Sequence, residues 1–261
     1  MLTTITLGEW SFQVDPRPHH RFWKRVNSGA WEPETYAIFD RHIDDRTLFL
    51  DIGAWIGSTS LYGAQLAQRC VAFEPDPVAF AELSRNVDQN RQADWIGKLQ
   101  IHERAINRDG QSFTLGGVGE GADSTSSALF PDRDSQWTVQ ALRLPDVLAE
   151  HRAEGQPVFL KIDIEGGEYD LIPAISDMLA DPLVTAYISF HPKMLRKSLA
   201  AGSEDEGWKA AYVDRHRSVL DSLPWSRWIG LSNGDPVTRP QLDRSLRRRF
   251  GFPEELLIRS P

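Results

Sequence analysis

Two glycines beside an aspartate mark the first stretch of this sequence that could bind a ligand. Residues 47–52 form a short apolar run that predicts a buried strand, and the segment DIGAWIG occupies residues 51–57. Gly53 and Gly57 allow a tight turn and a close approach of a ligand to the backbone. A helical pattern over residues 58–68 then presents unpaired amides and the positive end of its dipole to that turn. A strand, a glycine turn and a helix in this order are typical of a nucleotide-binding α/β unit.

The spacing of the glycines indicates which nucleotide this turn suits. A dinucleotide site needs G-x-G-x-x-G, in which the middle glycine makes room for a pyrophosphate. Here the spacing is G-x-x-x-G, with Ala54 and Trp55 where the middle glycine would fall. Asp51, at the end of the strand, would repel a pyrophosphate but attract an ammonium group. S-adenosylmethionine (SAM) has no phosphate and carries an ammonium and a sulfonium, so the local chemistry favours SAM over NAD. The alternative interpretation is an ordinary strand, loop and helix.

Three further residues are candidates for contacts with the same ligand. Glu74 ends the next predicted strand about 20 residues after the glycine turn, where an acid accepts hydrogen bonds from ribose hydroxyls in such folds; a solvated loop acid is the alternative. Ala105 follows the predicted third strand, at an exit that borders the adenine ring in SAM folds. Glu32, next to Trp31, precedes the unit and could approach the ligand's ammonium, or could equally be a surface carboxylate beside a packing tryptophan.

The second informative stretch is VFLKIDIEGGE at residues 158–168. It predicts a fourth buried strand in which Lys161, Asp163 and Glu165 share one side by strand alternation. Burying these groups costs free energy unless they pair with one another or serve a ligand. His191 follows the predicted fifth strand, residues 184–190. Ligands of open α/β sheets bind beyond the carboxyl ends of the strands. We therefore expect four side chains from four strands to meet at one edge: Asp51, Glu74, Asp163 and His191.

The remaining pattern predicts the elements that hold these residues. We expect an N-terminal hairpin with a turn at Gly8-Glu9, and an inserted hairpin within residues 111–143 whose mobile tip serves as a substrate lid or as a plain surface loop. The role of its loop at residues 116–135 stays open. Helices are expected over residues 34–42, 58–68, 144–152, 168–179 and 208–223, a helix capped by Asp76 begins at Pro77, and the chain ends in an antiparallel strand pair at 225–231 and 255–259.

Composition limits the class of protein. The chain has 261 residues, 41% hydrophobic and 25% charged, which suits one α/β domain with elaborations. A net charge of −8 argues against a nucleic-acid partner, and the basic cluster at 244–249 is explained by a solvated helix face. No apolar run could span a bilayer, and no secretory signal is visible. A single cysteine, Cys70, excludes an internal disulfide and fits a reducing cytoplasm, where we expect the protein to act.

Three segments together resemble the FkbM family of SAM-dependent methyltransferases: DIGAWIGSTSLYGA, VAFEPDP and FLKIDIEGGEYDLI. The resemblance covers about residues 29–192, and LKIDIEGGE is its most specific part. It implies an α/β, class I methyltransferase fold, with a Rossmann-like seven-stranded sheet that is mostly parallel and ends in an antiparallel strand. We expect residues 44–261 to form this domain and residues 1–43 to form an N-terminal hairpin and helical extension. Trp55 stands where family members often have Asn.

The resemblance also assigns roles to individual residues. It implies contacts to the methionine moiety of SAM from Asp51, Gly53, Ala54 and Gly57, and to the ribose from Glu74. Its acidic segment falls on Lys161, Asp163, Glu165, Gly166 and Glu168. Family membership implies O-methylation of a hydroxyl on a sugar, polyketide or lipid-like small molecule. It does not identify the acceptor, and the sequence leaves the oligomeric state open.

Methyl transfer requires in-line alignment of the acceptor oxygen and removal of its proton. We expect Asp163 to lie closest to the methyl group, as a contact of the cofactor as well as of the reaction. His191 is the expected base because its unperturbed pKa is about 6.5, with Asp163 or Glu165 as the alternative bases. A second version places Mg²⁺ between these three residues to lower the pKa of the acceptor. No spacing in the sequence demands a metal, so none is assigned.

Two other classes of protein remain as alternatives. An NAD(P)-dependent reductase is disfavoured by the missing middle glycine and by the acid-rich fourth strand. A non-catalytic binding protein that keeps the SAM fold would be indicated by substitutions at Asp163 or His191, and both positions carry suitable residue types.

Overall fold

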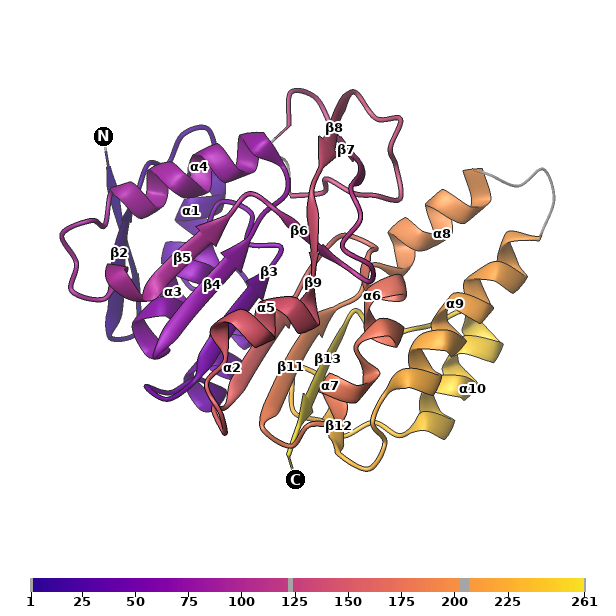
Figure 1. Cartoon of the computed structure of the whole chain (residues 1–261). Helices are drawn as coiled ribbons and strands as arrows, with labels where there is room; N and C mark the ends of the chain where they lie inside the picture. The colour runs from indigo at the N-terminus through magenta and orange to yellow at the C-terminus, as the bar shows by residue number, and fades with distance from the viewer. Residues whose placement is uncertain (1, 122–123, 202–206, 261) are drawn as a thin grey trace.

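A seven-stranded sheet crosses the computed structural model, which describes residues 2–121, 124–201 and 207–260 (Figure 1). The strand order is β12-β13-β11-β10-β3-β4-β5, and β13 runs antiparallel to β11 and to β12. This arrangement confirms the predicted mostly parallel sheet with a final antiparallel strand. The strands are β3 (Leu48–Ile52), β4 (Arg69–Phe73), β5 (Leu99–His102), β10 (Val158–Ile162), β11 (Val184–Ser189), β12 (Trp228–Gly230) and β13 (Glu255–Arg259).

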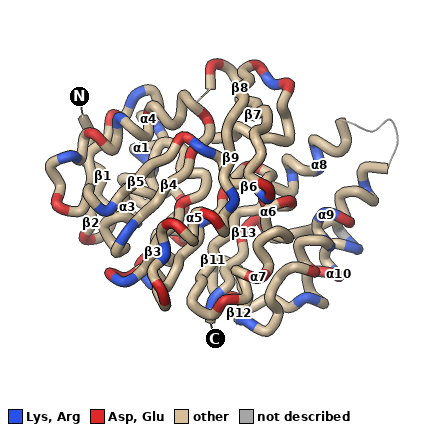
Figure 2. The backbone as a smooth tube through the Cα atoms, in the orientation of Figure 1, with Lys and Arg blue, Asp and Glu red and all other residues tan. Residues whose placement is uncertain are grey.

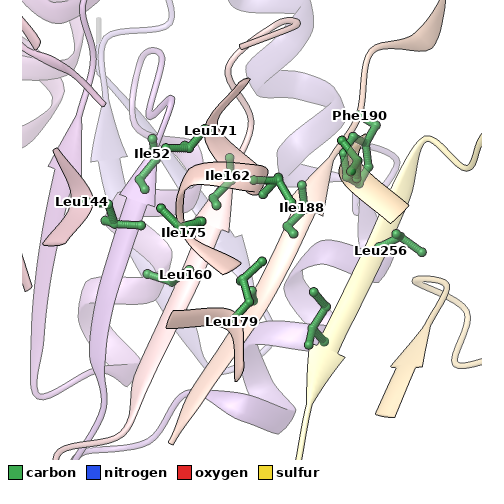
Figure 3. Close-up of a cluster of buried hydrophobic side chains, with 14 of the residues drawn as sticks. Ile52, Leu144, Leu160, Ile162, Leu171, Ile175, Leu179, Ile188, Phe190 and Leu256 are labelled. Atoms are coloured by element: carbon green, nitrogen blue, oxygen red, sulfur yellow. The ribbon is translucent and has the colours of Figure 1, made fainter. Parts of the chain in front are cut away.

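Helices cover both faces of this sheet, so the central strands are buried throughout. On β3, Leu48, Leu50 and Ile52 join one hydrophobic cluster, whereas Phe49 joins the other, as strand alternation requires. Figure 3 shows part of the first cluster, in which Ile162 and Ile188 lie beside residues of the covering helices. Burying a Leu or Ile side chain contributes about 1.5–3 kcal/mol, so this double-sided core fixes the strands that carry the site.

The N-terminal residues pack against the same sheet. The predicted hairpin is present as β1 (Thr3–Leu7) and β2 (Trp10–Val14), paired antiparallel across Gly8-Glu9. A helix that was not predicted, α1 (His20–Asn27), buries Phe22, Trp23 and Val26. Next, α2 (Pro33–His42) matches the predicted helix. The apolar side chains of these elements join the cluster that covers one face of the sheet.

The insertion after β5 contains four short strands. Its β7 (Phe113–Gly117) and β8 (Ser135–Val139) form the predicted antiparallel hairpin. The predicted hairpin extended to residue 143, but its last residues form a separate strand, β9 (Ala141–Arg143). This strand pairs in parallel with β6 (Ala105–Asn107). Residues 122–123, in the predicted mobile tip, lie outside the described residues. The hairpin stands at the top of the view in Figure 1, above α6.

Two helix predictions were wrong in detail. The helix expected over residues 168–179 is two helices, α6 (Glu168–Ala174) and α7 (Ser176–Ala180), which are separated at Ile175, where φ is −116° and ψ is 18°. The sequence analysis also missed α8 (Pro192–Ala201), which begins with Pro192 at its first position. The other helices are α3 (Ser58–Leu66), α4 (Pro77–Asp88), α5 (Leu144–His151), α9 (Trp208–Ser222), α10 (Arg239–Arg249) and a 3₁₀ turn at Ile96–Lys98.

The basic cluster of α10 lies on the outside of its helix. Leu242 and Leu246 of α10 are buried, whereas Arg244, Arg247 and Arg248 are exposed, so the basic cluster is a solvated helix face as predicted. Acidic and basic positions are interspersed along the chain in Figure 2. Within the described ranges, no helix combines the length and the apolar character needed to cross a membrane.

Candidate active site

A cavity of about 1040 Å³ opens at the carboxyl ends of β3, β4, β10 and β11. Most of the site residues predicted from the sequence line it: Glu32, Gly53, Ala54, Glu74, Ala105, Asp163, Glu165 and His191. Asp51 and Gly57 do not belong to its lining. The position agrees with the general rule that ligands of open α/β sheets bind where the parallel strands end.

The turn after β3 requires glycine at two positions for different reasons. Gly53 has φ +85°, and a Cβ there would lie 1.8 Å from the carbonyl oxygen of Asp163. Gly57 has φ +97° at the start of α3, and a Cβ there would lie 2.6 Å from Leu83 Cδ1. The backbone N–H groups of Gly53 and Ala54 both donate to the carbonyl of Phe73. Gly53 therefore shapes the cavity wall, whereas Gly57 fits α3 against α4.

Asp51 lies beneath the cavity. Its side chain is fully buried, and its Oδ2 accepts hydrogen bonds from the hydroxyls of Thr59 (2.7 Å) and Ser60 (2.6 Å). The predicted direct attraction between Asp51 and a ligand's ammonium does not fit this position, because the carboxylate is already engaged inside the protein. Two of the residues that contact Asp51, Thr59 and Lys161, line the cavity.

Lys161 links two strands at the floor of the cavity. Its Nζ donates to the carbonyl of Gly53 (3.2 Å) and to Asp163 Oδ2 (3.4 Å), and lies 3.5 Å from Asp51 Oδ1. Burial by itself would lower the pKa of this amine, but the nearby carboxylates, Asp163 first, raise it. A charged Lys161 therefore ties the exit of β10 to the glycine turn after β3.

Glu74 directly follows β4, and its carboxylate lies on the cavity wall. Its Oε2 accepts from the backbone N–H of Trp55 and its Oε1 from that of Asp76, both at 2.8 Å. Burial raises the pKa of Glu74 to about 8, although these two N–H donors act in the opposite direction. The ring of Trp55, the bulky departure from the family pattern, packs edge-on against Phe22 and His19. This acid is held in place by backbone groups and keeps free acceptor positions on the cavity side.

An acidic cluster surrounds His191 on the opposite side of the cavity. Its Nε2 lies 3.5 Å from Asp163 Oδ1 and 3.4 Å from Glu165 Oε2. Strand alternation is not the reason that these acids meet, because β10 already ends at Ile162. Glu165 instead lies in a left-handed bend, with φ +52°, which turns its carboxylate toward the histidine.

Glu168 positions this histidine, a role that the sequence analysis did not assign. Its Oε1 lies 2.7 Å from His191 Nδ1, and its two oxygens also accept the backbone N–H groups of Ile164 and Gly166. The side chain is fully buried at the first position of α6. The sequence signal for this role was an acid that directly follows a Gly-Gly turn and begins a helix.

The carboxylates change the acid–base behaviour of the cluster. Burial works to lower the pKa of His191, but its hydrogen bond to Glu168 and the charges of Asp163 and Glu165 raise it to about 9. Burial raises the pKa of Glu165 to about 8. The carboxylates therefore favour the protonated imidazole, whereas the base role expected of His191 assumed an ordinary pKa.

Backbone strain is concentrated around the cavity. Among the described residues, four non-glycine residues have left-handed φ values, and Glu32 (φ +44°), Trp55 (φ +48°) and Glu165 line the cavity. The fourth, Phe250, caps the end of α10. Strained positions of this kind persist where the surrounding structure over-determines them, commonly at functional sites. The pKa of Glu32 is raised by its burial and by Asp163, so its carboxylate belongs to the same electrostatic cluster.

The described part of the 116–135 loop forms a wall of the cavity. Ser126 donates to Asp76 Oδ2 (2.7 Å), and Ser127 donates to the carbonyl of Glu165 (2.5 Å). Leu129 covers Gly166 so closely that a Cβ there would lie 2.2 Å from Leu129 Cδ1. The loop thus connects the start of α4 to the acidic cluster.

Comparisons with known proteins identify a family for the chain. The family model "Methyltransferase FkbM domain" matches residues 51–214, more than half of the chain. Methyltransferase sdnD from Sordaria araneosa is 24% identical over 209 residues, 64% of this chain and 75% of that protein. The solved structure of methyltransferase FkbM from Methylobacillus flagellatus aligns with a TM-score of 0.47 and 15% identity over 90% of this chain; the chain spans about half (52%) of that structure's length. A putative methyltransferase from Streptococcus mutans in complex with SAH aligns with a TM-score of 0.44 and 9% identity, over 86% of this chain and 93% of that one. The chain therefore belongs to the FkbM family of SAM-dependent methyltransferases.

Proposed function

We propose that the protein transfers the methyl group of SAM to a hydroxyl of a small molecule that binds in the same cavity. The observation that carries this proposal is the joint position of Glu74 and the Asp163–Glu165–His191 cluster on one cavity of about 1040 Å³. Small-molecule sites commonly enclose about 300–1,000 Å³, so the cavity has room for a cofactor and an acceptor together. The net charge of −8 disfavours a nucleic acid as the acceptor.

SAM would lie along the ends of β3 and β4. The carboxylate of Glu74 would accept hydrogen bonds from the ribose hydroxyls, and the backbone at Ala105 would border the adenine. The methionine moiety would pass Gly53 and Ala54, with its ammonium toward Glu32. Residues 1–43 would then act as an extension that closes one side of the cofactor site, while residues 44–261 form the catalytic domain. A single buried cysteine, Cys70, fits a cytoplasmic protein.

The reaction would take place on the β10 and β11 side of the cavity. Attack by the acceptor oxygen forms the O–CH₃ bond as the S–CH₃ bond breaks, and the electron pair of the broken bond stays on sulfur. Asp163 would lie closest to the methyl group, because its backbone crosses the glycine turn that holds the cofactor. The hydroxyl proton would leave at the cluster of Asp163, Glu165 and His191, where two carboxylates could accept it.

Ligand binding followed by methyl transfer tests the proposal. Calorimetric titrations with SAH, SAM and NADH should give binding of the first two and none of the third. Incubation with radiolabelled SAM and fractionated small metabolites should then label an acceptor. In Asp163→Asn the labelling should fall by at least about 100-fold while SAH still binds, because the glycine turn and the carboxylate of Glu74 are unchanged. Binding of NADH without binding of SAH would refute the proposal, and so would full turnover in Asp163→Asn.

A further inference from the structure

The mouth of the cavity lies between the insertion and α8, which are neighbours in Figure 1. Ala128 of the insertion and Lys193 of α8 line the cavity and are exposed, so they mark the part of its wall that opens to solvent. The two segments are tied together, because the hydroxyl of Ser198 on α8 donates to the carbonyl of Leu129 (3.1 Å). Side chains of the insertion and of α8 are therefore held next to each other at this mouth.

Two cationic side chains, one from each segment, lie over the same aromatic ring. The guanidinium carbon of Arg133 is 4.4 Å from the centre of the Phe130 ring, and Nζ of Lys197 is 5.6 Å from it. Arg133 is half-buried and also donates to the carbonyl of Thr125. A cation over an aromatic ring gains about 0.5–1 kcal/mol at an exposed site. Phe130 thus holds two positive charges close together.

Neither of these cations has a carboxylate partner. Lys193, at the same mouth, is paired with Glu254 (2.7 Å), whereas within the described part of the chain no carboxylate is within ion-pair distance of Arg133 or Lys197. The two aspartates that flank Arg133 in the sequence are exposed and do not pair with it. Like charges repel each other, so an anion bound between Arg133 and Lys197 would remove an unfavourable interaction.

This pair of cations lies within electrostatic reach of the acidic cluster. Burial raises the pKa of Glu165 to about 8, and the charges of His191 and Arg133 act in the opposite direction. The segment that carries Arg133 begins beside the cluster, where Leu129 covers Gly166. A small molecule whose hydroxyl lies at the cluster can therefore place a second group at the mouth, against the two cations.

The kind of anion follows from the two cationic groups. A phosphate monoester carries about −1.5 to −2 charges at pH 7 and three acceptor oxygens, whereas a carboxylate carries only one charge. A guanidinium binds phosphate through two parallel hydrogen bonds, and an ammonium adds a point charge. The chain as a whole has a net charge of −8, so two unpaired cations on one ring are a local exception to its negative charge. An arginine and a lysine together match a phosphate better than a carboxylate.

We propose that Arg133 and Lys197 bind a phosphate group at the mouth of the cavity, and that this phosphate belongs to the methyl acceptor, a phosphorylated small molecule. The phosphate takes no part in bond making or breaking. It holds the acceptor so that its hydroxyl points toward the cluster of Asp163, Glu165 and His191. The phosphate site itself does not depend on methyl transfer, whereas its assignment to the acceptor rests on the proposed function.

Calorimetric titration with inorganic pyrophosphate at low ionic strength, with and without SAH, tests the phosphate site without turnover. Arg133→Gln and Lys197→Gln should each weaken pyrophosphate binding at least about fivefold, or about 1 kcal/mol. Arg196→Gln is the matched control, because Arg196 is an exposed cation of the same helix that lies over Trp208 instead (5.9 Å), and its loss should change the affinity by less than about twofold. Thermal unfolding reports that each variant is folded. Absence of pyrophosphate binding, or an equal loss in Arg196→Gln, would overturn the site.

The labelled product of methyl transfer tests the acceptor assignment. After incubation with radiolabelled SAM and fractionated small metabolites, the labelled product should be retained on an anion-exchange column and lose this retention after treatment with phosphatase. In Arg133→Gln and Lys197→Gln, KM for this acceptor should rise at least about fivefold while kcat stays within about twofold, because the phosphate is held equally before and during the reaction.

The outcomes separate this proposal from the proposed function. A labelled product that does not bind the column, or that phosphatase leaves unchanged, would overturn the phosphorylated acceptor and leave methyl transfer standing. Pyrophosphate binding that depends on Arg133 and Lys197, in a protein that binds neither SAM nor SAH, would overturn the proposed function and leave the phosphate site standing.

Discussion

The two sides of the cavity present different chemistry to a ligand. We call the part after β3 and β4 the cofactor side and the part after β10 and β11 the acceptor side, as the proposed function assigns them. The cofactor side consists of a glycine bend, backbone groups and the carboxylate of Glu74. The acceptor side, after β10 and β11, gathers charged side chains around His191. Groups of the first kind fit a ligand by shape and hydrogen bonds, whereas groups of the second kind can move protons or bind cations. We therefore expect changes on the cofactor side to act on SAM affinity and changes on the acceptor side to act on turnover.

Both sides contain left-handed backbone, at glycines and at residues with side chains. On the cofactor side the left-handed Gly53 has no side chain, because the backbone of Asp163 occupies that space. On the acceptor side the left-handed position is a glutamate, Glu165, whose carboxylate reaches His191. A left-handed residue with a side chain costs about 1–2 kcal/mol. Trp55 and Glu32 carry the same cost on the cofactor side, so strained backbone with a side chain marks both sides of the cavity.

The largest effect should follow Gly53→Ala. The added methyl would overlap the carbonyl of Asp163 and disfavour φ +85°, so the turn must move. We expect the affinity for SAH to fall at least about 100-fold, or about 2.7 kcal/mol, in calorimetric titration. Gly8→Ala is the matched control, because Gly8 also has a left-handed φ (+58°) but has no atom near its added Cβ. An equal loss of SAH affinity in both variants would contradict crowding as the cause.

A smaller effect should separate the two sides of the cavity. Glu74→Gln replaces one carboxylate oxygen with an NH₂ group, which cannot accept the hydrogen bonds that Glu74 accepts. SAH affinity should therefore fall about 10- to 50-fold. This loss lies in the range of about 1.5–3 kcal/mol that is typical of hydrogen bonds to charged groups. Glu165→Gln should leave SAH affinity within about twofold but reduce the rate of methyl transfer at saturating SAM. SAH affinity and the rate of methyl transfer should be measured in both variants. If Glu165→Gln weakened SAH binding as much as Glu74→Gln, the division into two sides would be wrong.

The smallest effect concerns the helices behind the acceptor side. His216 of α9 is fully buried against Tyr169 of α6, and burial lowers its pKa to about 4. The unfolded chain binds a proton at this residue between pH 6.5 and 4, whereas the folded chain does not, so stability falls as pH decreases through this window. At pH 5.5 this effect lowers the free energy of unfolding by about 1.4 kcal/mol.

Denaturant unfolding at pH 7.5 and 5.5 checks this prediction. The wild-type chain should lose about 1.4 kcal/mol more stability between these pH values than His216→Phe, which keeps a ring of similar size. Hydrogen exchange at pH 5.5 should increase more in α6 and α9 than in α3 on the cofactor side. Identical pH dependence in the two proteins would show that His216 does not titrate in this way.

The cofactor side could be predicted in most of its parts. The strand, glycine turn and helix at residues 47–68 and the acid at the end of β4 are where the sequence placed them, because hydrophobic period and backbone sterics are local properties. The family assignment also sets aside the NAD(P)-dependent reductase that the same strand–turn–helix pattern left open. The burial of Asp51 could not be predicted, because it depends on hydroxyls eight and nine residues further along and on Lys161.

The acceptor side could be predicted only as a set of residue types. The sequence indicated that acids and a histidine follow β10 and β11, but strand alternation was the wrong reason for their meeting. The left-handed bend at Glu165 and the buried support from Glu168 depend on packing between β10, α6 and β11. The serine contacts of the 116–135 loop join segments 38 and 50 residues apart, which no local pattern encodes.

The sequence by itself determined the order of strands and helices, the glycine bend and the two acidic strand ends, because these follow from periodicity and from which residues tolerate a left-handed turn. Only the tertiary structure decided which acids face the cavity and which accept hydrogen bonds inside the protein. It also decided the charge of His191, since a pKa depends on burial and on neighbours that are distant in the chain.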